Sequence, residues 1–203
     1  MIVAAKKFTD KKIFIASGNR GKIKEISDLL SDLPIEVLSI KDISLASPAE
    51  TEDSFSGNAL LKARYYAQET GLPSLADDSG LCVEALSGAP GVFSARWAED
   101  DNFALAMARI EKELRIKNSN NFRAYFACAL ALVWPDSDEE IICEGRVDGS
   151  LVFPPRGNLG FGYDPIFVPE GYNITFAEMQ PTEKHKISHR ARAFAHLWQR
   201  VFV

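Results

Sequence analysis

A buried strand that runs into two adjacent carboxylates sets the first limit on how this chain folds. The stretch reads Ser74-Leu-Ala-Asp77-Asp78-Ser79-Gly80-Leu81. Its apolar start predicts a strand, and Asp-Asp-Ser-Gly is typical of the turn that ends one. Because adjacent carboxylates repel each other, a nearby cation would help to keep both ionised, and Mg²⁺ suits this role because it takes oxygen ligands. A polar turn without a metal is the alternative that this stretch leaves open.

A strand, a tight loop and a helix follow one another near the N-terminus. Ile13–Ser17 predicts a buried strand and Gly18–Lys22 predicts a loop, with a helix that begins near Arg20. The apolar residues of this helix share one face and are Ile23, Ile26, Leu29 and Leu30. Pro34 marks its end.

The loop before this helix is a candidate phosphate site. Backbone N–H groups at a helix start favour an anion, and Lys22 adds a positive charge. It is not a Walker loop, because only two residues separate Gly18 from Gly21 and because Ile23 follows Lys22. Phosphate binding and a capped turn without a ligand therefore both remain open.

The rest of the chain carries further strand and helix signals. Residues 1–11 predict a short disordered or extended lead-in. The other predicted strands span 35–40, 122–134, 141–147 and 163–168, with a short piece at 151–153 after a turn at Asp148-Gly149. The predicted helices span 54–70 and 101–117, and a last one begins at Ser188.

Length and composition fit one domain that spans residues 1–203. Of the 203 residues, 46% are hydrophobic, which suffices for one substantial core. A formal net charge of −5 argues against a broad nucleic-acid-binding face. The three cysteines, Cys82, Cys128 and Cys143, lie in apolar stretches without metal-ligand spacing and are predicted to be buried free thiols. A polar N-terminus and short apolar stretches lead us to expect a cytoplasmic protein without membrane contact.

A positive cluster lies near the C-terminus of this acidic chain and consists of Lys184, Lys186, His189 and Arg190. It surrounds the start of the last predicted helix. Cations at a helix N-terminus oppose the helix dipole, so an anion nearby would explain their position. A solvated helix start is the plainer alternative.

Five blocks occur in order along the chain, and together they are far more specific than any one of them. They are Ser17-Gly-Asn-Arg-Gly-Lys22 with Glu25, Leu75-Ala-Asp-Asp-Ser-Gly-Leu81, Gly88-Ala-Pro-Gly91 with Ser94-Ala-Arg96, Gly160-Phe-Gly-Tyr-Asp-Pro-Ile-Phe167, and Glu183-Lys184 with Ser188-His-Arg190. In these blocks the sequence resembles the inosine triphosphate pyrophosphatase family, over residues 13–200.

The resemblance implies an elongated α/β fold in which helices flank a long mixed β-sheet and the active site lies in a central cleft between two lobes. It also implies a homodimer and a Mg²⁺-dependent enzyme. The implied reaction is the hydrolysis of non-standard purine nucleoside triphosphates, namely ITP, dITP and XTP, to the monophosphate and pyrophosphate. Such a reaction would remove deaminated purines from the nucleotide pool.

The family pattern also assigns residues. It makes Asp78 the general base and a metal ligand, and it makes Glu50 the second metal carboxylate, with Glu52 or Asp53 as alternatives in the same segment. Lys22 would contact phosphate. The other implied substrate contacts are Ser17, Gly18, Asn19, Arg20 and Gly21 at the triphosphate, then Ser79, and then Phe161, Gly162, Tyr163, Asp164, Lys184, His189 and Arg190 in the nucleotide pocket.

The choice of base follows from the chemistry at position 6 of the purine. Hypoxanthine and xanthine carry an oxygen there, whereas adenine carries an amino group. A cationic donor, for which Arg190 is our candidate, would favour the oxygen and make ATP a poor substrate. Guanine shares the 6-oxo group, and the sequence does not reveal what rejects GTP.

Two other functions remain as alternatives. The first is a Maf-type pyrophosphatase that acts on other modified nucleotides or on pyrimidine nucleotides. The second is a nucleic-acid-binding or regulatory module that uses the cluster at 184–190, although the acidic net charge argues against it. A hydrolase with Ser79 as its nucleophile has the least support, because no nucleophile-elbow pattern surrounds that serine.

Overall fold

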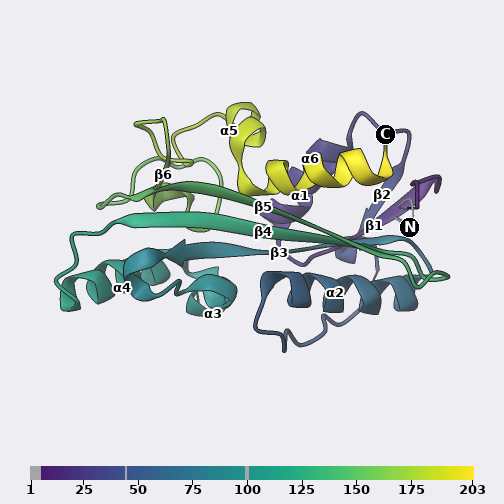
Figure 1. Cartoon of the computed structure of the whole chain (residues 1–203), viewed down its shortest axis with the longest axis horizontal. Helices are drawn as coiled ribbons and strands as arrows, with labels where there is room; N and C mark the ends of the chain where they lie inside the picture. Colours follow the sequence, from purple (N-terminus) through teal and green to yellow (C-terminus); the bar gives the residue numbers. More distant parts are fainter. Residues whose placement is uncertain (1–5, 44, 99–100) are drawn as a thin grey trace, which may run out of the picture. The chain divides into compact units, whose positions relative to one another are not determined.

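The computed structural model describes residues 6–43, 45–98 and 101–203 and contains a six-stranded sheet with the strand order β2-β1-β3-β4-β5-β6. Figure 1 shows the elements along the chain. Their bounds are β1 (Lys12–Ala16), α1 (Arg20–Leu30), β2 (Glu36–Ser39), α2 (Phe55–Thr70), β3 (Ser74–Val83), α3 (Ser94–Trp97), α4 (Phe103–Ile116), β4 (Arg123–Val133), β5 (Glu140–Leu151), β6 (Phe167–Pro169), α5 (Pro181–Ile187) and α6 (His189–Val201).

The sheet is mixed. Strand β1 pairs in parallel with both β2 and β3, and Ile15 lies opposite Ser39 on one side and Leu75 on the other. At the other edge, β5 pairs antiparallel with β6. Parallel neighbours need a crossover, and α1 and α2 supply it between β1, β2 and β3. The expected α/β fold with a mixed sheet and flanking helices is thereby confirmed.

The chain divides into two compact units, each built from several segments. Unit 1 comprises Met1–Asp78, Cys128–Gly145 and Arg190–Val203. Unit 2 comprises Ser79–Ala127 and Arg146–His189. Each unit has buried apolar clusters of its own, and we describe the two separately. The cleft that the family resemblance implies stays a prediction.

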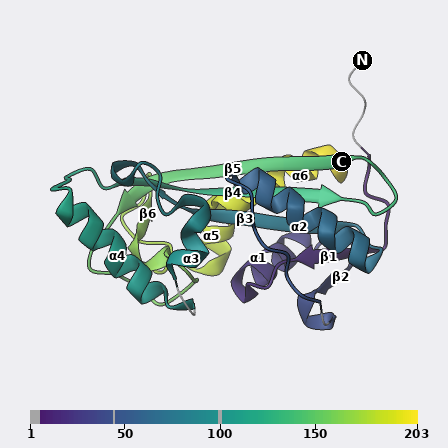
Figure 2. The ribbon, with the colours of Figure 1, turned by 90° about the horizontal axis from the view of Figure 1, so that it is seen from below.

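In unit 1 helices cover both faces of the sheet. Helices α1 and α6 lie on one face and α2 lies on the other (Figure 1), and the view from below has α2 in front of the strands (Figure 2). The α1 and α6 side is filled by large aliphatic and aromatic residues, among them Ile26, Leu30, Leu75 and Leu197. The α2 side carries small residues of the helix, namely Ala59, Ala63 and Ala67, so that α2 packs close to the strands.

The N-terminal segment of unit 1 differs from the expected lead-in. Residues 1–5 lie outside the described residues. The backbone N–H of Phe8 donates to the carbonyl of Val201 at 2.8 Å, and its ring centroid lies 5.3 Å from that of Phe202. Trp134 Nε1 donates to Asp10 Oδ2 at 3.0 Å. The segment from Phe8 onward is therefore held to unit 1 by ring packing and hydrogen bonds, which its polar composition did not indicate.

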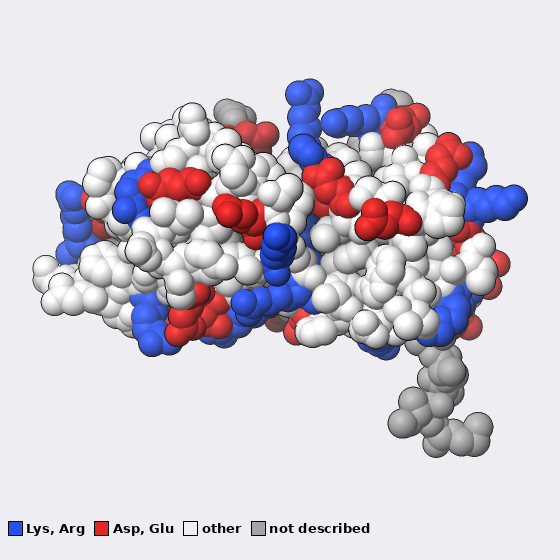
Figure 3. Space-filling view, turned by 90° about the horizontal axis from the view of Figure 1, so that it is seen from above, with Lys and Arg blue, Asp and Glu red and all other residues white. Residues whose placement is uncertain are grey.

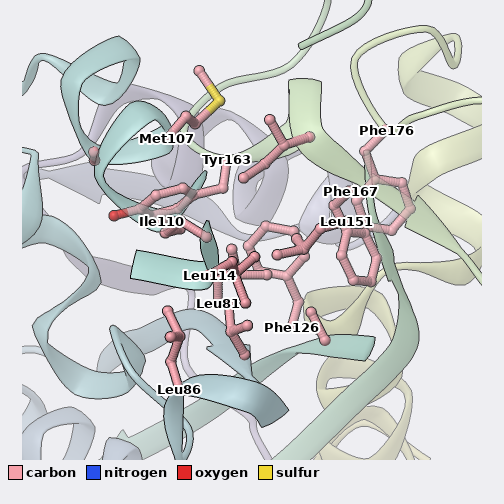
Figure 4. Packing of buried hydrophobic residues seen from close by; sticks show 14 of the residues in the cluster. Leu81, Leu86, Met107, Ile110, Leu114, Phe126, Leu151, Tyr163, Phe167 and Phe176 are labelled. Atoms are coloured by element: carbon pink, nitrogen blue, oxygen red, sulfur yellow. The ribbon is translucent and has the colours of Figure 1, made fainter. Parts of the chain in front are cut away.

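Unit 2 has one core cluster, which collects residues from strands, helices and loops (Figure 4). Helix α4 contributes Ile110 and Leu114, and β4 contributes Phe126. The ring of Phe126 meets the ring of Phe167 edge-on at 4.8 Å, which aromatic rings favour because of their quadrupoles. The irregular chain after β5 is thereby anchored to the sheet.

Two expected turns lie inside strands. Asp-Asp-Ser-Gly was predicted to end a strand, yet β3 continues from Ser74 to Val83. Asp148-Gly149 was predicted to open a turn, yet β5 continues to Leu151, because Gly149 pairs with Pro169 of β6. In both cases pairing with neighbouring strands overrides a local turn preference.

Several other expectations are confirmed. Helices α1, α2 and α4 lie where the 3.6-residue periodicity predicts them. Ser54 caps α2, since its side chain accepts from the backbone N–H of Gly57, and Gly71 ends α2 in the left-handed conformation. All three cysteines are buried and free. Apart from these expectations, no helix among the described residues is long and apolar enough to cross a bilayer.

Candidate active site

The course of β3 places two neighbouring carboxylates on opposite faces of the sheet. Side chains alternate along a strand, so Asp77 follows Leu75 toward α1 and α6, and Asp78 follows Ala76 toward α2. The sequence suggested that the two aspartates repel each other and share a cation. Their side chains instead point to opposite faces: Asp77 pairs with Lys22 and Arg190, and Asp78 pairs with Lys62.

On the α2 side of unit 1, two carboxylates converge on one ammonium. Lys62 Nζ lies 2.6 Å from Glu50 Oε1 and 3.0 Å from Asp78 Oδ1. Burial alone would lower the pKa of Lys62, but Asp78 and Glu50 outweigh it and raise the pKa above its ordinary value. Lys62 therefore stays protonated and holds Glu50 and Asp78 a few ångströms apart.

Asp78 is a stronger base than an ordinary aspartate. Burial is the largest influence and raises its pKa, the cations Lys62 and Lys22 lower it, and Glu50 raises it again. The net pKa lies above the usual carboxyl value. A raised pKa suits a group that must accept a proton from water.

The donor set on this side suits a hard divalent cation. Asp78 Oδ2 is buried and has no hydrogen-bond partner among the described residues, so one oxygen of this carboxylate remains for a ligand. Within the ranges that the structure describes, no group of three or more His, Cys, Asp or Glu residues gathers for a metal. Two carboxylates plus phosphate oxygens and water are nevertheless a usual Mg²⁺ environment.

Of the three carboxylates considered for the second metal position, the structure brings only Glu50 to Lys62 and Asp78. Glu52 and Asp53 are exposed. The backbone of Glu52 is tied to α2 instead, because its N–H donates to Asn58 Oδ1 at 3.0 Å. This geometry favours Glu50 over its neighbours.

On the α1 and α6 side of unit 1, Asp77 joins two cations. Lys22 Nζ lies 2.7 Å from Asp77 Oδ1, and Arg190 Nε donates to Asp77 Oδ2 at 2.8 Å. Arg190 also pairs with Glu25 through its other end, and the Cys128 thiol donates to Asp77 Oδ2 at 3.1 Å. Burial raises the pKa of Asp77, but Arg190 and Lys22 outweigh burial and hold this pKa well below its usual value.

The loop before α1 folds as a capped turn that presents Lys22. Asn19 is the N-cap, and its Oδ1 accepts from the backbone N–H of Lys22 at 3.1 Å. The backbone N–H of Asn19 donates to Ser17 Oγ at 3.2 Å. Gly18 and Arg20 are exposed, whereas Ser17 is buried. Ser17, Asn19 and Lys22 are thus brought together at the helix start.

In unit 2 the residues predicted for the nucleotide pocket form a second polar group. Lys184 Nζ lies 2.6 Å from Asp164 Oδ2, and both side chains are almost fully buried. The same ammonium lies 4.7 Å from the ring centroid of Phe161. Asp164 Oδ2 also accepts from the backbone N–H of Phe161 at 2.9 Å. Gly160 allows this approach, since a Cβ there would lie 2.1 Å from Asp164 Oδ2.

Other predicted pocket residues have structural contacts in unit 2. Tyr163 is buried, and its hydroxyl donates to the carbonyl of Ser94 at 2.9 Å. The ring of His189 stacks on Phe126 at a centroid distance of 4.8 Å. Gly162 takes a left-handed conformation with φ of 66°. Ser79 is half-buried in β3.

Arg190 was our candidate for the donor that reads the 6-oxo group of the base. Its side chain is 1% exposed and pairs with Asp77 and Glu25. Burial lowers the pKa of Arg190, but these two carboxylates raise it overall, so that its charge is fixed. The role of Arg190 as the base-reading donor stays a prediction.

The family pattern assigned no role to Lys62, Asp77 or Glu25. A signal for one of them was present, because Lys62 falls on the same helical stripe as Ala59, Ala63 and Tyr66. A charged residue within an apolar stripe must find a partner, because an unpaired buried charge is costly.

Comparisons with known proteins identify the family of this chain. A profile of the Ham1 family matches residues 13–200. This chain belongs to the Ham1 family. Among curated Ham1 relatives, the dITP/XTP pyrophosphatase of Rhodospirillum centenum is 51% identical, and the alignment covers 99% of this chain and 100% of the relative. The dITP/XTP pyrophosphatase of Caulobacter vibrioides is 54% identical, with 94% and 98% covered.

Solved structures of Ham1 proteins share the fold. The HAM1 protein from Coxiella burnetii superimposes with a TM-score of 0.85 at 40% identity, covering 94% of this chain and 98% of that one. A nucleoside-triphosphatase described as a dITP/XTP pyrophosphatase, from Mycobacterium abscessus, gives a TM-score of 0.72 at 45% identity, with 92% and 98% covered. The agreement extends over nearly the whole of each protein.

Proposed function

We propose that this chain is a pyrophosphatase for non-standard purine nucleoside triphosphates and converts ITP, dITP and XTP to the monophosphate and pyrophosphate. Its Ham1 relatives named dITP/XTP pyrophosphatase support this reaction. The observation that carries the proposal is the pair Glu50 and Asp78 on Lys62, because it couples a cation site with a base of raised pKa. The role is the removal of deaminated purines from the nucleotide pool.

The triphosphate is proposed to bind at the start of α1. The backbone N–H groups there and the ammonium of Lys22 favour an anion. The contacts that we assign are Ser17, Gly18, Asn19, Arg20, Gly21 and Lys22, with Ser79 as a further one. An ammonium has three N–H donors, so Lys22 can hold Asp77 and still donate to phosphate.

Mg²⁺ is the metal that we propose at Glu50 and Asp78. Carboxylate oxygens of Glu50 and Asp78 converge on one ammonium, and the buried Asp78 Oδ2 has no hydrogen-bond partner within the part of the chain that the structure describes. Both observations support this choice. When bound, the ion would neutralise phosphate charge and lower the pKa of a bound water. A homodimer and a cytoplasmic location are further proposals, and they rest on the family resemblance alone.

Asp78 is proposed to remove the proton from the attacking water. The oxygen of that water forms a bond to the α-phosphorus, the bond from that phosphorus to the bridging oxygen breaks, and pyrophosphate leaves with the electron pair. Lys22 and Lys62 place positive charge where the phosphate charge develops. Both ammonium groups are held by carboxylates, so little reorganisation accompanies the reaction.

The base is proposed to bind in unit 2 near Phe161, Gly162, Asp164, Lys184 and His189. Phe161 offers an aromatic face, and Lys184 is a cationic donor beside it. A buried donor favours the 6-oxo group of hypoxanthine or xanthine and would be left opposite the amino group of adenine. The hydroxyl of Tyr163 donates to the carbonyl of Ser94, so we propose that Tyr163 holds this segment in place.

Pyrophosphate release from ITP, XTP, GTP and ATP tests the proposal, with Mg²⁺ and with EDTA. Fast turnover of ITP and XTP that EDTA abolishes is expected, with ATP nearly untouched. Asp78→Asn should lower kcat by about 10³-fold, which is within the range of general-base catalysis. Turnover confined to pyrimidine nucleotides would favour the Maf-type alternative. The absence of turnover with any nucleotide would overturn the proposal that this chain is a nucleotide pyrophosphatase.

A nucleic-acid-binding module has less support. Figure 3 shows Lys and Arg interspersed with Asp and Glu over one face of the molecule. Together with the net charge of −5, this mixed surface differs from the clustered basic face that binds a phosphate backbone. Salt-sensitive RNA binding without hydrolysis would support that alternative.

A further inference from the structure

Asp77 is enclosed in unit 1 and contacts groups from three elements. Its side chain is 0% exposed. Its Oδ1 accepts from Lys22 of α1, and its Oδ2 accepts from Arg190 of α6 and from Cys128 of β4. Because side chains alternate along β3, Asp77 points away from the α2 side, where Glu50 and Asp78 pair with Lys62.

Charge in this cluster is balanced. Two carboxylates, Asp77 and Glu25, face two cations, Lys22 and Arg190. Arg190 is 1% exposed and is bound at both ends, so it fixes the orientation of Asp77 through Oδ2. Lys22 is the member of the four that solvent reaches most, with 16% of its side chain exposed. The cluster therefore fixes one ammonium at its edge.

We infer that Asp77 is a positioning residue whose carboxylate, held by Arg190, sets the place of the Lys22 ammonium for turnover. This rests on the proposed function, in which Lys22 contacts the triphosphate. Asp77 itself touches no reacting atom. Its two oxygens are divided between the anchor and the ammonium, so a rotation of the carboxylate moves Lys22.

The variant Asp77→Asn separates the positioning of Lys22 from the electrostatic effect of the negative charge on Asp77. An amide has one acceptor oxygen where the carboxylate has two. Because Arg190 is only 1% exposed, we expect it to keep that oxygen, and Lys22 then loses its partner. Loss of the negative charge strengthens anion binding, whereas a disordered Lys22 weakens it, and the two effects oppose each other in the ground state. Misplacement of Lys22 costs most in the transition state, where the phosphate charge that it stabilises develops.

The experiment is a double-mutant cycle of Asp77→Asn and Lys22→Met, with kcat and KM for ITP in Mg²⁺. We expect Asp77→Asn to lower kcat by about 100-fold, the effect of an ångström-scale misplacement, with KM within about threefold of wild type. In the Lys22→Met background the same change should alter kcat by less than about threefold, since the ammonium that it acts on is gone.

A purely structural Asp77 gives a different result. It would lower kcat by the same factor in both backgrounds, and that result, like an unchanged kcat in Asp77→Asn, would overturn the inference. Cys128→Ala is the matched control, because it removes a neutral partner of the same Oδ2 and should leave kcat unchanged. If Asp77→Asn does not fold, Asp77→Glu keeps the charge and displaces the oxygens, and it carries the same cycle. A wild-type protein inactive on ITP and XTP would overturn the proposed function instead.

Discussion

Asp77 and Asp78 are adjacent, and their surroundings shift their pKa values in opposite directions. Arg190 and Lys22 lower the pKa of Asp77 more than burial raises it. At Asp78 burial prevails over Lys62 and Lys22, and the pKa is raised. Ionised Asp77 therefore adds to the free energy of unfolding at neutral pH, and ionised Asp78 subtracts from it.

The first prediction concerns acid stability. The stabilisation from Asp77 is complete above the unfolded carboxyl pKa and is lost as pH falls below about 4, through the depressed folded pKa. Asp77→Asn should lower the free energy of unfolding at pH 7 by about 3–5 kcal/mol, because Arg190 loses an ionic partner. Urea titrations from pH 7 to pH 3 should show this difference shrink with acidification, and a difference independent of pH would contradict the assignment.

The second prediction separates the candidate metal carboxylates. Glu50→Gln should weaken Mn²⁺ binding by at least about tenfold, because even groups outside the ligand shell contribute that much to metal sites. Glu52→Gln is the matched control, since Glu52 is exposed and its backbone is tied to Asn58. Titration calorimetry in the absence of nucleotide measures the Mn²⁺ affinity of both variants. Equal affinities in the two would rule out Glu50 as a ligand.

The ordered blocks and the family pattern assigned individual site residues, and these assignments stay predictions. They did not predict the contacts of these residues, in which Lys22 pairs with Asp77 while Glu50 and Asp78 pair with Lys62. The partnership of Arg190 with Asp77 spans 113 positions in the chain, and no local pattern encodes it. A cation near a helix start suggested a ligand, whereas two buried carboxylates satisfy it.

At the level of elements, β3 shows how pairing overrides local preference. Asp-Asp-Ser-Gly favours a turn, yet each residue has a place in the strand. Gly80 leaves room for Ser94, whose Oγ accepts from the backbone N–H of Leu81 at 3.0 Å and donates to the carbonyl of Gly91 at 2.6 Å. The periodic helices were predicted well because their signal is local, whereas a strand that contains turn residues depends on its neighbours.

The third prediction follows from this contact. A Cβ at Gly80 would lie 2.3 Å from Ser94 Oγ and 2.4 Å from the carbonyl oxygen of Gly91. Gly80→Ala should therefore lower the free energy of unfolding by about 1–3 kcal/mol, the usual cost of overpacking. Urea denaturation measures the loss. Gly18→Ala is the control, because nothing lies within 4 Å of its added Cβ, and equal stability of the two variants would contradict the steric argument.

For the whole molecule, the segment at Phe8 meets the C-terminal helix within unit 1. Phe8 packs against Phe202, and its backbone bonds to Val201. The sequence predicted a disordered or extended lead-in over residues 1–11. A single aromatic residue with a hydrophobic partner near residue 200 leaves no periodic signal, so this contact could not be predicted.

The fourth prediction tests that contact. Phe8→Ala should lower the free energy of unfolding by about 1–3 kcal/mol, less than a fully buried phenylalanine would because Phe8 is half-buried. The fluorescence of Trp134 reports the site directly, since its ring centroid lies 6.1 Å from that of Phe8. Thr9→Ala, next along the chain and exposed, should leave both signals unchanged. Stability unaffected by Phe8→Ala would show that the segment does not contribute to the fold.

The segmented make-up of the two units restricts how this protein can have arisen and how it can be engineered. The chain passes from one unit to the other after Asp78, Ala127, Gly145 and His189. No single cut releases either unit as a continuous piece. Gene fusion of two ready-made modules therefore does not explain this architecture, and recombination between relatives can exchange a unit only as several fragments at once. A change of substrate choice is therefore reached more simply by point substitution within one segment than by exchange of a whole unit.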